Sequence, residues 1–586
     1  MSISRNLVRI IKIPLRDNKR DLAISIIAIV FTASLQMSIP YYLGLTIDKA
    51  FDGNLEQDLS ITPFIQIGIL VFILSLLRGV FHYYHMFTGE KIGQSIAFKL
   101  RKSYFDKLQN LSFSFHDTVH TGDLITKGII DIEGVRLFVN TGILRFFLLG
   151  IFIMTGAILV LRIDLILGLL ALSYIPFIGI VSSVTRLSLR QNWIRLQAQL
   201  GILTRVMDEN LSGVRLVRSF MRQKYELQKF SIASSVVRKT TFKQIFIKST
   251  SVSINSFMFL ISMSLVIYFG ALSVIDQTIT IGELAALIAF MSILQGPVRH
   301  IGQLVNSIAR ASAASARLYD VLDQSVDVKN NEKSIKFSDP VEEIKIENLC
   351  FSYGKNEVLK NISFSANPKH SVGIVGPPGA GKTTLSRLLP RFYNLNSGRI
   401  LLNGINIEDI NLGHLRNSIN LVDQDLFLFS DTFRENVRFG KPTADQEEIK
   451  SSTLKAHIYN HIDKLPERFE TLIGERGVQL SGGQRQRLSV SRTFLYHSKV
   501  VIFDDSTSAI DTQTEKEIRE EMNELGENIS LIVIAHRISS VMNLDEILYL
   551  DNGIISERGS HKELIKLNGK YANLYKMQIN PELRVK

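Results

Sequence analysis

The sequence predicts a protein of two parts, an all-α membrane domain followed by an α/β domain built around a P-loop. Hydrophobic residues make up 46% of the 586 residues and are concentrated before about residue 300. The second half contains a glycine-rich G-x-x-x-x-G-K-[ST] motif behind a strand-like apolar run, and a second apolar run that ends in two aspartates. A chain of this length is expected to form more than one domain.

The membrane domain is predicted to have six spans, because about 20 mostly apolar residues cross the hydrocarbon core. Stretches of that kind occur at about 21–45, 61–85, 137–161, 163–184, 247–272 and 281–300. The third and fourth are separated only by Arg162, Ile163 and Asp164, which predicts a tight hairpin. The long basic segments 86–136 and 185–246 predict helices that continue beyond the bilayer into the cytoplasm.

The distribution of basic residues predicts the orientation of these spans. The first 20 residues carry six Lys and Arg, whereas the segment after the first span has one lysine against four acids. The N-terminus, the two long segments and the second half are therefore expected in the cytoplasm. Basic residues at the ends of spans also account for the net charge of +12 without a nucleic-acid partner.

The domain boundaries follow from these changes in composition. We expect a membrane domain over 1–325, a polar linker over 326–342, an α/β domain over 343–578 and a tail over 579–586. The N-terminus lacks the pattern of a removable signal peptide. The single cysteine, Cys350, excludes an intrachain disulfide and is typical of a reducing compartment.

The P-loop motif predicts a nucleotide site. Its residues are Gly376, Pro377, Pro378, Gly379, Ala380, Gly381, Lys382, Thr383 and Thr384. Backbone N–H groups of such a loop surround phosphates, the lysine neutralises the outer phosphates, and the Thr383 hydroxyl can ligate Mg²⁺. Asp504, at the end of the run "VVIFDD", is in the position of the acid that holds Mg²⁺ through water.

A second anion-binding motif lies between these two. The sequence Leu480-Ser481-Gly482-Gly483-Gln484 opens a predicted helix, where free N–H groups and the helix dipole favour a negative charge. Taken alone, this short motif would be weak evidence. Between a P-loop and "VIFDD", it decides the family that the sequence resembles.

The chain resembles ATP-binding cassette (ABC) exporters of the multidrug and lipid type, as a half-transporter with the membrane domain and the ATPase in one chain. The resemblance covers nearly the whole length. It implies that ATP and Mg²⁺ are bound and that two cassettes pack head-to-tail, with ATP between the P-loop of one and the LSGGQ of the other. It also implies roles for Tyr353 (stacking on adenine), Gln424 (contact with Mg²⁺, water and the membrane domain) and His536 (contact with the γ-phosphate). Glu475 resembles the loop that senses the partner's helices, and Ser508–Asp511 the loop that touches the opposite cassette.

One residue departs from the family pattern. The family usually has a glutamate after the magnesium aspartate, where it orients or deprotonates the attacking water, and this chain has Asp505. Its carboxylate is withdrawn by roughly 1.5 Å, and a displacement of about 1 Å can slow a reaction on the order of 100-fold. Together with an unaltered LSGGQ, this favours a heterodimer with a different half-transporter. A homodimer with slow sites, or with water held by His536 and Gln424, is the alternative.

The expected activity is ATP-driven export or flipping of an amphipathic lipid or drug-like molecule across a bacterial-type cytoplasmic membrane. ATP-driven closure of the cassettes is expected to reach the spans through turns near Thr121–Asp123 and Gly213–Ser219. Arg78, Arg145 and Arg299 lie toward the inner ends of spans two, three and six, similar to the basic residues of lipid A flippases, and are candidates for substrate binding. Alternatively, these arginines extend to the lipid headgroups. An ATP-gated channel or a regulatory membrane protein would share every motif.

Overall fold

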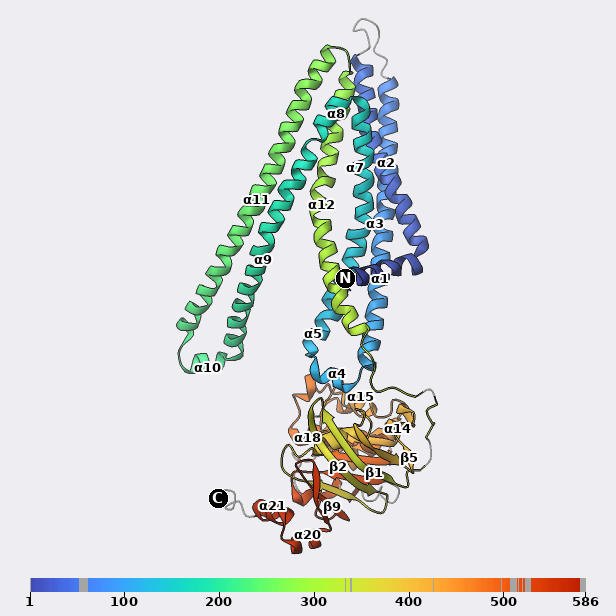
Figure 1. Ribbon diagram of the computed structural model, residues 1–586, viewed down its shortest axis with the longest axis vertical. Helices are drawn as coiled ribbons and strands as arrows, with labels where there is room; N and C mark the ends of the chain where they lie inside the picture. The colour runs from blue at the N-terminus through green and yellow to red at the C-terminus, as the bar shows by residue number, and fades with distance from the viewer. Residues whose placement is uncertain are drawn as a thin grey trace. The chain divides into compact units, whose positions relative to one another are not determined.

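The structure, a computed structural model (Figure 1), describes residues 2–51, 62–331, 333–337, 340–424, 426–496, 498–505, 514, 516–518, 520–521 and 529–579. Within these ranges the side chains at 2–4, 11, 13–15, 63, 186, 297–306 and 476 are not described. The chain divides into two compact units. The first comprises Met1–Gln109 and Thr121–Gln324, and the second Asn110–His120 and Ser325–Lys586.

The first unit is helical, as predicted. Its helices are α1 (Ser2–Asp17), α2 (Lys19–Phe51), α3 (Thr62–Asn110, of which the last residue belongs to the second unit), α5 (Thr121–Thr126), α6 (Ile132–Leu137), α7 (Arg145–Ile163), α8 (Leu165–Leu172), α9 (Tyr174–Ser212), α10 (Val214–Ser219), α11 (Gln223–Ile275) and α12 (Ile281–Leu322), with π-helical segments η1 (Lys127–Asp131) and η2 (Phe138–Leu144). Helices α3, α9 and α11 have 49, 39 and 53 residues, far more than a bilayer requires. The predicted extensions beyond the membrane are therefore confirmed.

Apolar segments occur at the six predicted positions. Five helical stretches within the described residues are long and apolar enough to span a membrane: Lys19–Phe51, Phe64–Asn110, Thr121–Ile163, Leu165–Ser212 and Gln223–Ile275. The apolar part of α12, Ile281–Gly296, is shorter. Many large apolar side chains on these helices are exposed, as expected for surfaces that face lipid tails.

The predicted hairpin between the third and fourth spans is present. Helix α7 ends at Ile163 and α8 begins at Leu165, so only Asp164 joins them. Its extended backbone turns the chain, and its carboxylate accepts a hydrogen bond from the Leu167 N–H at 2.7 Å. This N-cap satisfies one of the free donors at the start of α8.

Helices α2 and α12 approach each other closely through small residues. A Cβ atom on Gly282 would lie 2.0 Å from the Gly44 carbonyl oxygen, so only glycine fits there. The Asp48 carboxylate accepts hydrogen bonds from the Thr280 hydroxyl and from the Gly282 N–H, both at 2.7 Å. Small residues that allow backbones to approach, together with a polar contact, are typical of helix pairs in membranes.

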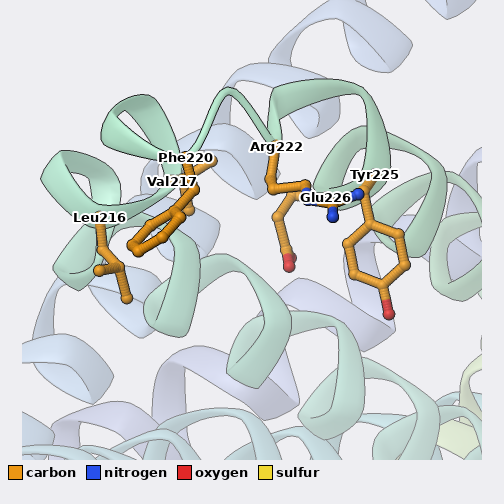
Figure 2. Close-up of a pocket in the computed structure, with 6 residues that line it drawn as sticks. All are labelled: Leu216, Val217, Phe220, Arg222, Tyr225 and Glu226. Carbon is orange, nitrogen blue, oxygen red and sulfur yellow. The ribbon is translucent and has the colours of Figure 1, made fainter.

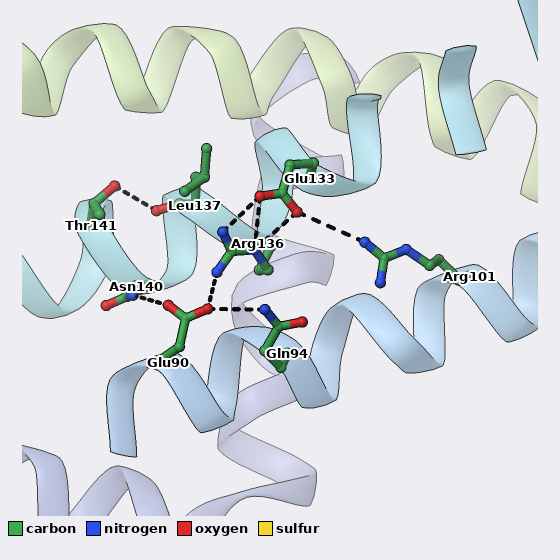
Figure 3. Close-up of polar contacts among 8 residues, drawn as sticks. All are labelled: Glu90, Gln94, Arg101, Glu133, Arg136, Leu137, Asn140 and Thr141. Atoms are coloured by element: carbon green, nitrogen blue, oxygen red, sulfur yellow. Dashed lines mark hydrogen bonds and ion pairs between the residues drawn. The ribbon is translucent and has the colours of Figure 1, made fainter. Parts of the chain in front are cut away.

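A polar cluster joins α3 to the helix that contains η1 and η2 (Figure 3). The Arg136 guanidinium forms ion pairs with Glu133 on its own helix and with Glu90 on α3. Asn140 donates a second hydrogen bond to Glu90 at 2.6 Å. Because the arginine lies between two carboxylates, its charge is compensated where it is largely buried.

The second unit contains two sheets. The strands are β1 (Ile344–Tyr353), β2 (Asn356–Ala366), β3 (Val372–Val375), β4 (Ser397–Leu402), β5 (Ile405–Asn406), β6 (Ile419–Val422), β7 (Val500–Asp504), β8 (Ser530–Ile534), β9 (Glu546–Asp551) and β10 (Ile554–Gly559). One antiparallel sheet has the order β2-β1-β4-β5, and the other has the order β10-β9-β3-β8-β7-β6. Strands β9, β3, β8, β7 and β6 are parallel, which confirms the predicted α/β domain.

Helices cover these sheets. They are α4 (Phe113–Thr118), α13 (Lys382–Leu388), α14 (Leu412–Ser418), α15 (Phe433–Arg438), α16 (Gln446–Lys455), α17 (Tyr459–Ile462), α18 (Gly482–Tyr496), α20 (His561–Leu567) and α21 (Lys570–Ile579), with short 3₁₀ turns η3 (Arg468–Glu470), η4 (Glu475–Gly477) and η6 (Ile538–Ser540). The main core lies between the two sheets and α13, and a second core packs β6 and β7 against α15, α16 and α18. The parallel strands β3, β6 and β7 end at one edge of the sheet, where ligands commonly bind in α/β folds.

Candidate functional site

The P-loop follows β3 directly, and the first carbonyl groups of the loop contact the lysine at its end. Lys382 is 5% exposed, and its amino group donates hydrogen bonds to the carbonyl oxygens of Gly376 at 2.8 Å and Pro377 at 3.0 Å. Gly376, Gly379 and Gly381 all have positive φ, which explains the glycines of the motif. Burial lowers the pKa of Lys382, and the negative charges of Asp504 and Asp505 oppose that change.

Asp504 lies at the end of β7, beneath the P-loop helix α13. Its side chain is 2% exposed. The Ser386 hydroxyl donates a hydrogen bond to Asp504 Oδ2 at 2.7 Å, and the Thr383 hydroxyl lies 3.5 Å from Oδ1. Burial raises the pKa of the Asp504 carboxyl, and the hydrogen bonds from Ser386 and Thr383 oppose the rise. A buried carboxylate and a hydroxyl at the start of α13 therefore meet where a hard cation would have oxygen ligands.

Asp505 continues the chain at the surface edge of the same strand. Its backbone is in the left-handed region, with φ +45°, and its N–H donates to the Ile534 carbonyl at 2.8 Å. One carboxylate oxygen accepts a long hydrogen bond, 3.4 Å, from the His536 N–H. The structure thus brings Asp505 and His536 together at the ends of β7 and β8. The His536 side chain itself is exposed.

Tyr353 lies at the end of β1, with 38% of its surface exposed. Its ring packs edge-on against Phe351 and Tyr393, with centroids 4.9 and 5.5 Å away. Tyr353 is therefore a partly exposed aromatic side chain held in place by two other rings.

The signature motif begins α18 and is separate from the P-loop. Ser481 and Gln484 form a reciprocal cap, in which the Gln484 side chain accepts from the Ser481 N–H at 2.9 Å and the Gln484 N–H donates to the Ser481 hydroxyl at 3.3 Å. The Gln484 amide also lies 3.3 Å from a ring nitrogen of His461. Among the described residues, no side chain of this motif contacts the P-loop of the same chain.

The remaining predicted residues have different outcomes. Gln424 is exposed just after β6, and Glu475 is exposed in η4. Ser508–Asp511 lies outside the described residues, as does the side chain of Arg299. Arg78 and Arg145 are partly buried, and Arg78 Nε has no hydrogen-bond partner among the described residues.

Sequence reasoning overlooked two histidines beside Arg78. His82 and His85 follow Arg78 on α3 at positions i+4 and i+7, so the three lie on one helix face. His85 is 4% exposed and lies 3.5 Å from the Ser25 hydroxyl of α2. The helical spacing was the available signal.

A short helix from the membrane half of the sequence belongs to the second unit. Helix α4 packs there through Phe113, whose ring stacks on Phe392 with centroids 4.4 Å apart. The Tyr393 hydroxyl donates a hydrogen bond to Asp117 at 2.6 Å. This segment ends at His120, just before the Thr121–Asp123 turn that the sequence indicated as a mechanical link. The sequence signal missed these contacts because they join residues far apart in the chain, 276 positions in the case of Asp117 and Tyr393.

The second inner segment has a different surface. Helices α9 and α11 run side by side and are joined by α10 (Figure 1). A pocket at this tip is lined by Leu216, Val217, Phe220, Arg222, Tyr225 and Glu226 (Figure 2). Leu216 and Phe220 are 63% and 69% exposed. The segment predicted as a turn at Gly213–Ser219 instead forms the helix α10 over Val214–Ser219, which exposes the apolar side chain of Leu216.

Two family models match the sequence. The ABC transporter transmembrane region matches residues 22–298, and the ABC transporter domain matches residues 359–508. The chain is 32% identical over 571 residues to the ATP-dependent lipid A-core flippase of Desulfotalea psychrophila, covering 96% of this chain and 97% of that one. The chain belongs to the ABC transporter family.

Other relatives agree with this family. The chain is 33% identical over 566 residues to a putative multidrug export ATP-binding/permease protein of Staphylococcus aureus, covering 94% of this chain and 97% of the relative. It is 30% identical over 558 residues to the uncharacterized ABC transporter ATP-binding protein YknU of Bacillus subtilis, with 94% of each covered. A solved bacterial Atm1-family ABC exporter with ATP bound shares the fold, with a TM-score of 0.78 and 24% identity over 96% of this chain and 98% of that one.

As an ABC transporter, the chain combines a membrane domain and an ATP-hydrolysing domain. Its apolar helices and its relatives place it in the bacterial inner membrane as a multi-pass protein with the ATPase domain in the cytoplasm. It is of the exporter type, and ATP drives the transport.

Proposed function

We propose that this ABC transporter is one half of a dimeric exporter of amphipathic lipids or drug-like molecules, and that its own P-loop site hydrolyses ATP slowly. The observation that carries the proposal is Asp505 beside Asp504, in a chain whose LSGGQ is unaltered. The relatives named as a lipid A-core flippase and a multidrug export protein support the substrate class.

ATP would lie between the P-loop of one half and Ser481, Gly482, Gly483 and Gln484 of the other. The separation of the signature motif from the P-loop within one chain supports this arrangement, since a partner must then supply it. Residues Gly376–Thr384 would surround the phosphates, and Tyr353 would stack on the adenine. The Lys382 amino group donates hydrogen bonds to the carbonyl oxygens of Gly376 and Pro377, and phosphate oxygens would replace these carbonyls as its partners.

The residues around Asp504 fit a magnesium ion. Thr383 Oγ1 and Asp504 Oδ1 are oxygen donors 3.5 Å apart at the end of the P-loop, the donor type that Mg²⁺ prefers. Thr383 and Gln424 would be direct ligands, and Asp504 would hold the ion through water. When bound, the ion would neutralise charge on the phosphates.

In this proposal, ATP hydrolysis is slow because the side chain of Asp505 is too short to hold the attacking water. Its carboxylate is one methylene shorter than glutamate and accepts a hydrogen bond from the His536 N–H, which holds it near the strand end. A water that attacks the γ-phosphate would need a base that extends farther from the strand end than the Asp505 carboxylate does. His536 would contact the γ-phosphate, and Gln424 would help to position the water. The competent site of the dimer would then belong to a partner half, and a heterodimer is the assembly we favour.

Substrate would contact the inner part of the spans. Arg78 supports this assignment because its Nε is buried without a hydrogen-bond partner, which is costly unless a ligand or water satisfies it. Arg145 and Arg299 would complete a basic surface for an anionic headgroup. Helix α10, whose apolar residues are exposed, would dock on the ATPase domain of the partner half.

The first experiment is ATPase activity of the chain purified alone in lipid, compared with its Asp505→Glu variant. Negligible turnover in both is the result expected for an obligate heterodimer. If only the glutamate variant is fast, by about 100-fold, the chain self-assembles and Asp505 is what slows it.

Two controls accompany this measurement. Asp504→Asn should abolish turnover of any active form, and Asp463→Asn, which breaks an exposed ion pair with Arg468, should change nothing. Rapid hydrolysis by the native chain would contradict the slow-site proposal.

A further inference from the structure

A third carboxylate, that of Asp423, lies beside Asp504, the last residue of β7. Strands β6 and β7 are parallel, and Val422 pairs with Phe503. Asp423 follows the end of β6 and Asp504 ends β7, so the two carboxylates are neighbours at the edge of the sheet, close enough for the charge of Asp423 to act on Asp504. Both contact the P-loop helix α13, Asp504 through Ser386 and Asp423 through Arg387.

The two oxygens of Asp423 have different surroundings. Oδ2 lies 3.6 Å from the Arg387 guanidinium, which holds the side chain on the α13 side of the sheet. Oδ1 is inaccessible to solvent and has no hydrogen-bond partner within the described part of the chain. A buried carboxylate oxygen without a donor costs free energy, so a donor is expected when the site is loaded.

We propose that Asp423 is a positioning residue for the divalent cation, holding a metal-bound water through Oδ1 next to the one held by Asp504. This inference rests on the magnesium site of the proposed function. Arg387 orients the carboxylate, in the way that outer residues of metal sites orient the groups closer to the ion. The site would then use two adjacent aspartates for cation binding, with Asp505 left for the attacking water.

Loss of Asp423 is expected to weaken the binding of the cation more than the binding of the nucleotide. A carboxylate that acts through metal-bound water contributes only when the cation is present. Without the cation, its negative charge lies near the phosphates and gives ATP no favourable contact. Loss of Asp423 is therefore expected to raise the Mg²⁺ requirement and to leave ATP binding in EDTA unchanged or slightly tighter.

The test uses the full chain in lipid nanodiscs and the Asp423→Asn variant, which keeps the size of the side chain. Thermal unfolding is followed at fixed ATP while Mg²⁺ is titrated, and again with ATP and EDTA. The Mg²⁺ concentration for half of the stabilisation should rise about tenfold in Asp423→Asn. Arg387→Gln should give a smaller rise, because Asp423 remains but is no longer oriented.

The matched control is Asp463→Asn, which breaks an aspartate–arginine pair of similar length, 3.4 Å, outside the P-loop. An equal Mg²⁺ requirement in Asp423→Asn, the control and the native chain would overturn the inference and leave the magnesium site intact. A shift of the unfolding midpoint of equal size with Mg²⁺ and with EDTA would also overturn it, because that is the signature of a purely structural role. If the native chain shows no Mg²⁺ dependence, the proposed magnesium site fails and this inference with it.

Discussion

The two short helices of the inner segments, α4 and α10, have opposite surroundings although both are six residues long. Helix α4 belongs to the ATPase unit, where Phe113 stacks on Phe392 and Asp117 accepts a hydrogen bond from Tyr393. Neither helix contains a buried residue, but Leu216 of α10 and Phe220 directly after it are 63% and 69% exposed, against 41% for Phe113 of α4. Within this chain, α4 therefore has aromatic and hydrogen-bond partners, whereas Leu216 and Phe220 stay exposed at the tip formed by α9, α10 and α11.

The largest effect is expected from breaking the packing of α4. Phe113→Ala combined with Asp117→Ala removes an aromatic stack and the acceptor of Tyr393, and should destabilise the ATPase unit by about 2 kcal/mol. Transport of a fluorescent amphipathic dye into inverted vesicles should fall about tenfold, while ATP binding is retained. Thermal unfolding and dye uptake measure the two effects.

Thr118→Ala is the control on the same helix, since the Thr118 hydroxyl bonds only within α4. Transport at the native rate by the Phe113/Asp117 variant would contradict the expectation that the packing of α4 is needed for transport.

A smaller and different effect is expected from α10. Leu216→Ser combined with Phe220→Ser should change the unfolding free energy of the chain by less than about 0.5 kcal/mol, because both side chains are exposed. ATPase activity of the assembled dimer should nevertheless fall severalfold, since the apolar contact with the partner is lost. Arg215→Ala, on the same helix, keeps the apolar side chains and should retain activity.

Unfolding at a clearly lower temperature in the α10 variant would show that this helix is packed in the single chain. The contrast with α4 would then disappear.

A smaller loss of stability than in the Phe113/Asp117 variant is expected from Tyr393→Phe, which removes only the hydrogen bond to Asp117. We expect a loss of about 1 kcal/mol at neutral pH, measured by denaturant unfolding. Burial, with the bond to Asp117, raises the pKa of the Tyr393 hydroxyl. The native hydroxyl therefore keeps its proton when the unfolded chain loses it, and the native chain should lose stability above about pH 10.

The phenylalanine variant lacks this ionisation, so the difference between the two proteins should shrink as the pH rises. A difference that grows with pH would contradict the assignment.

The sequence alone was sufficient for the architecture and the nucleotide motifs. Spans, the Asp164 hairpin, the P-loop and the strand that ends at Asp504 are local patterns, because composition and spacing within a few residues determine whether a segment enters a membrane or ends at a sheet edge. The family followed from the order of those motifs.

Only the tertiary structure decided which distant residues meet. Asp423 lies beside Asp504 because β6 and β7 pair in one particular register, and that register depends on how both strands pack against α13 and α18. Helix α4 contacts Phe392 and Tyr393, and His85 contacts Ser25. Each of these contacts joins segments that are distant in the sequence. Contacts of this kind carry no local sequence signal, because each depends on the packing of elements that the rest of the chain positions.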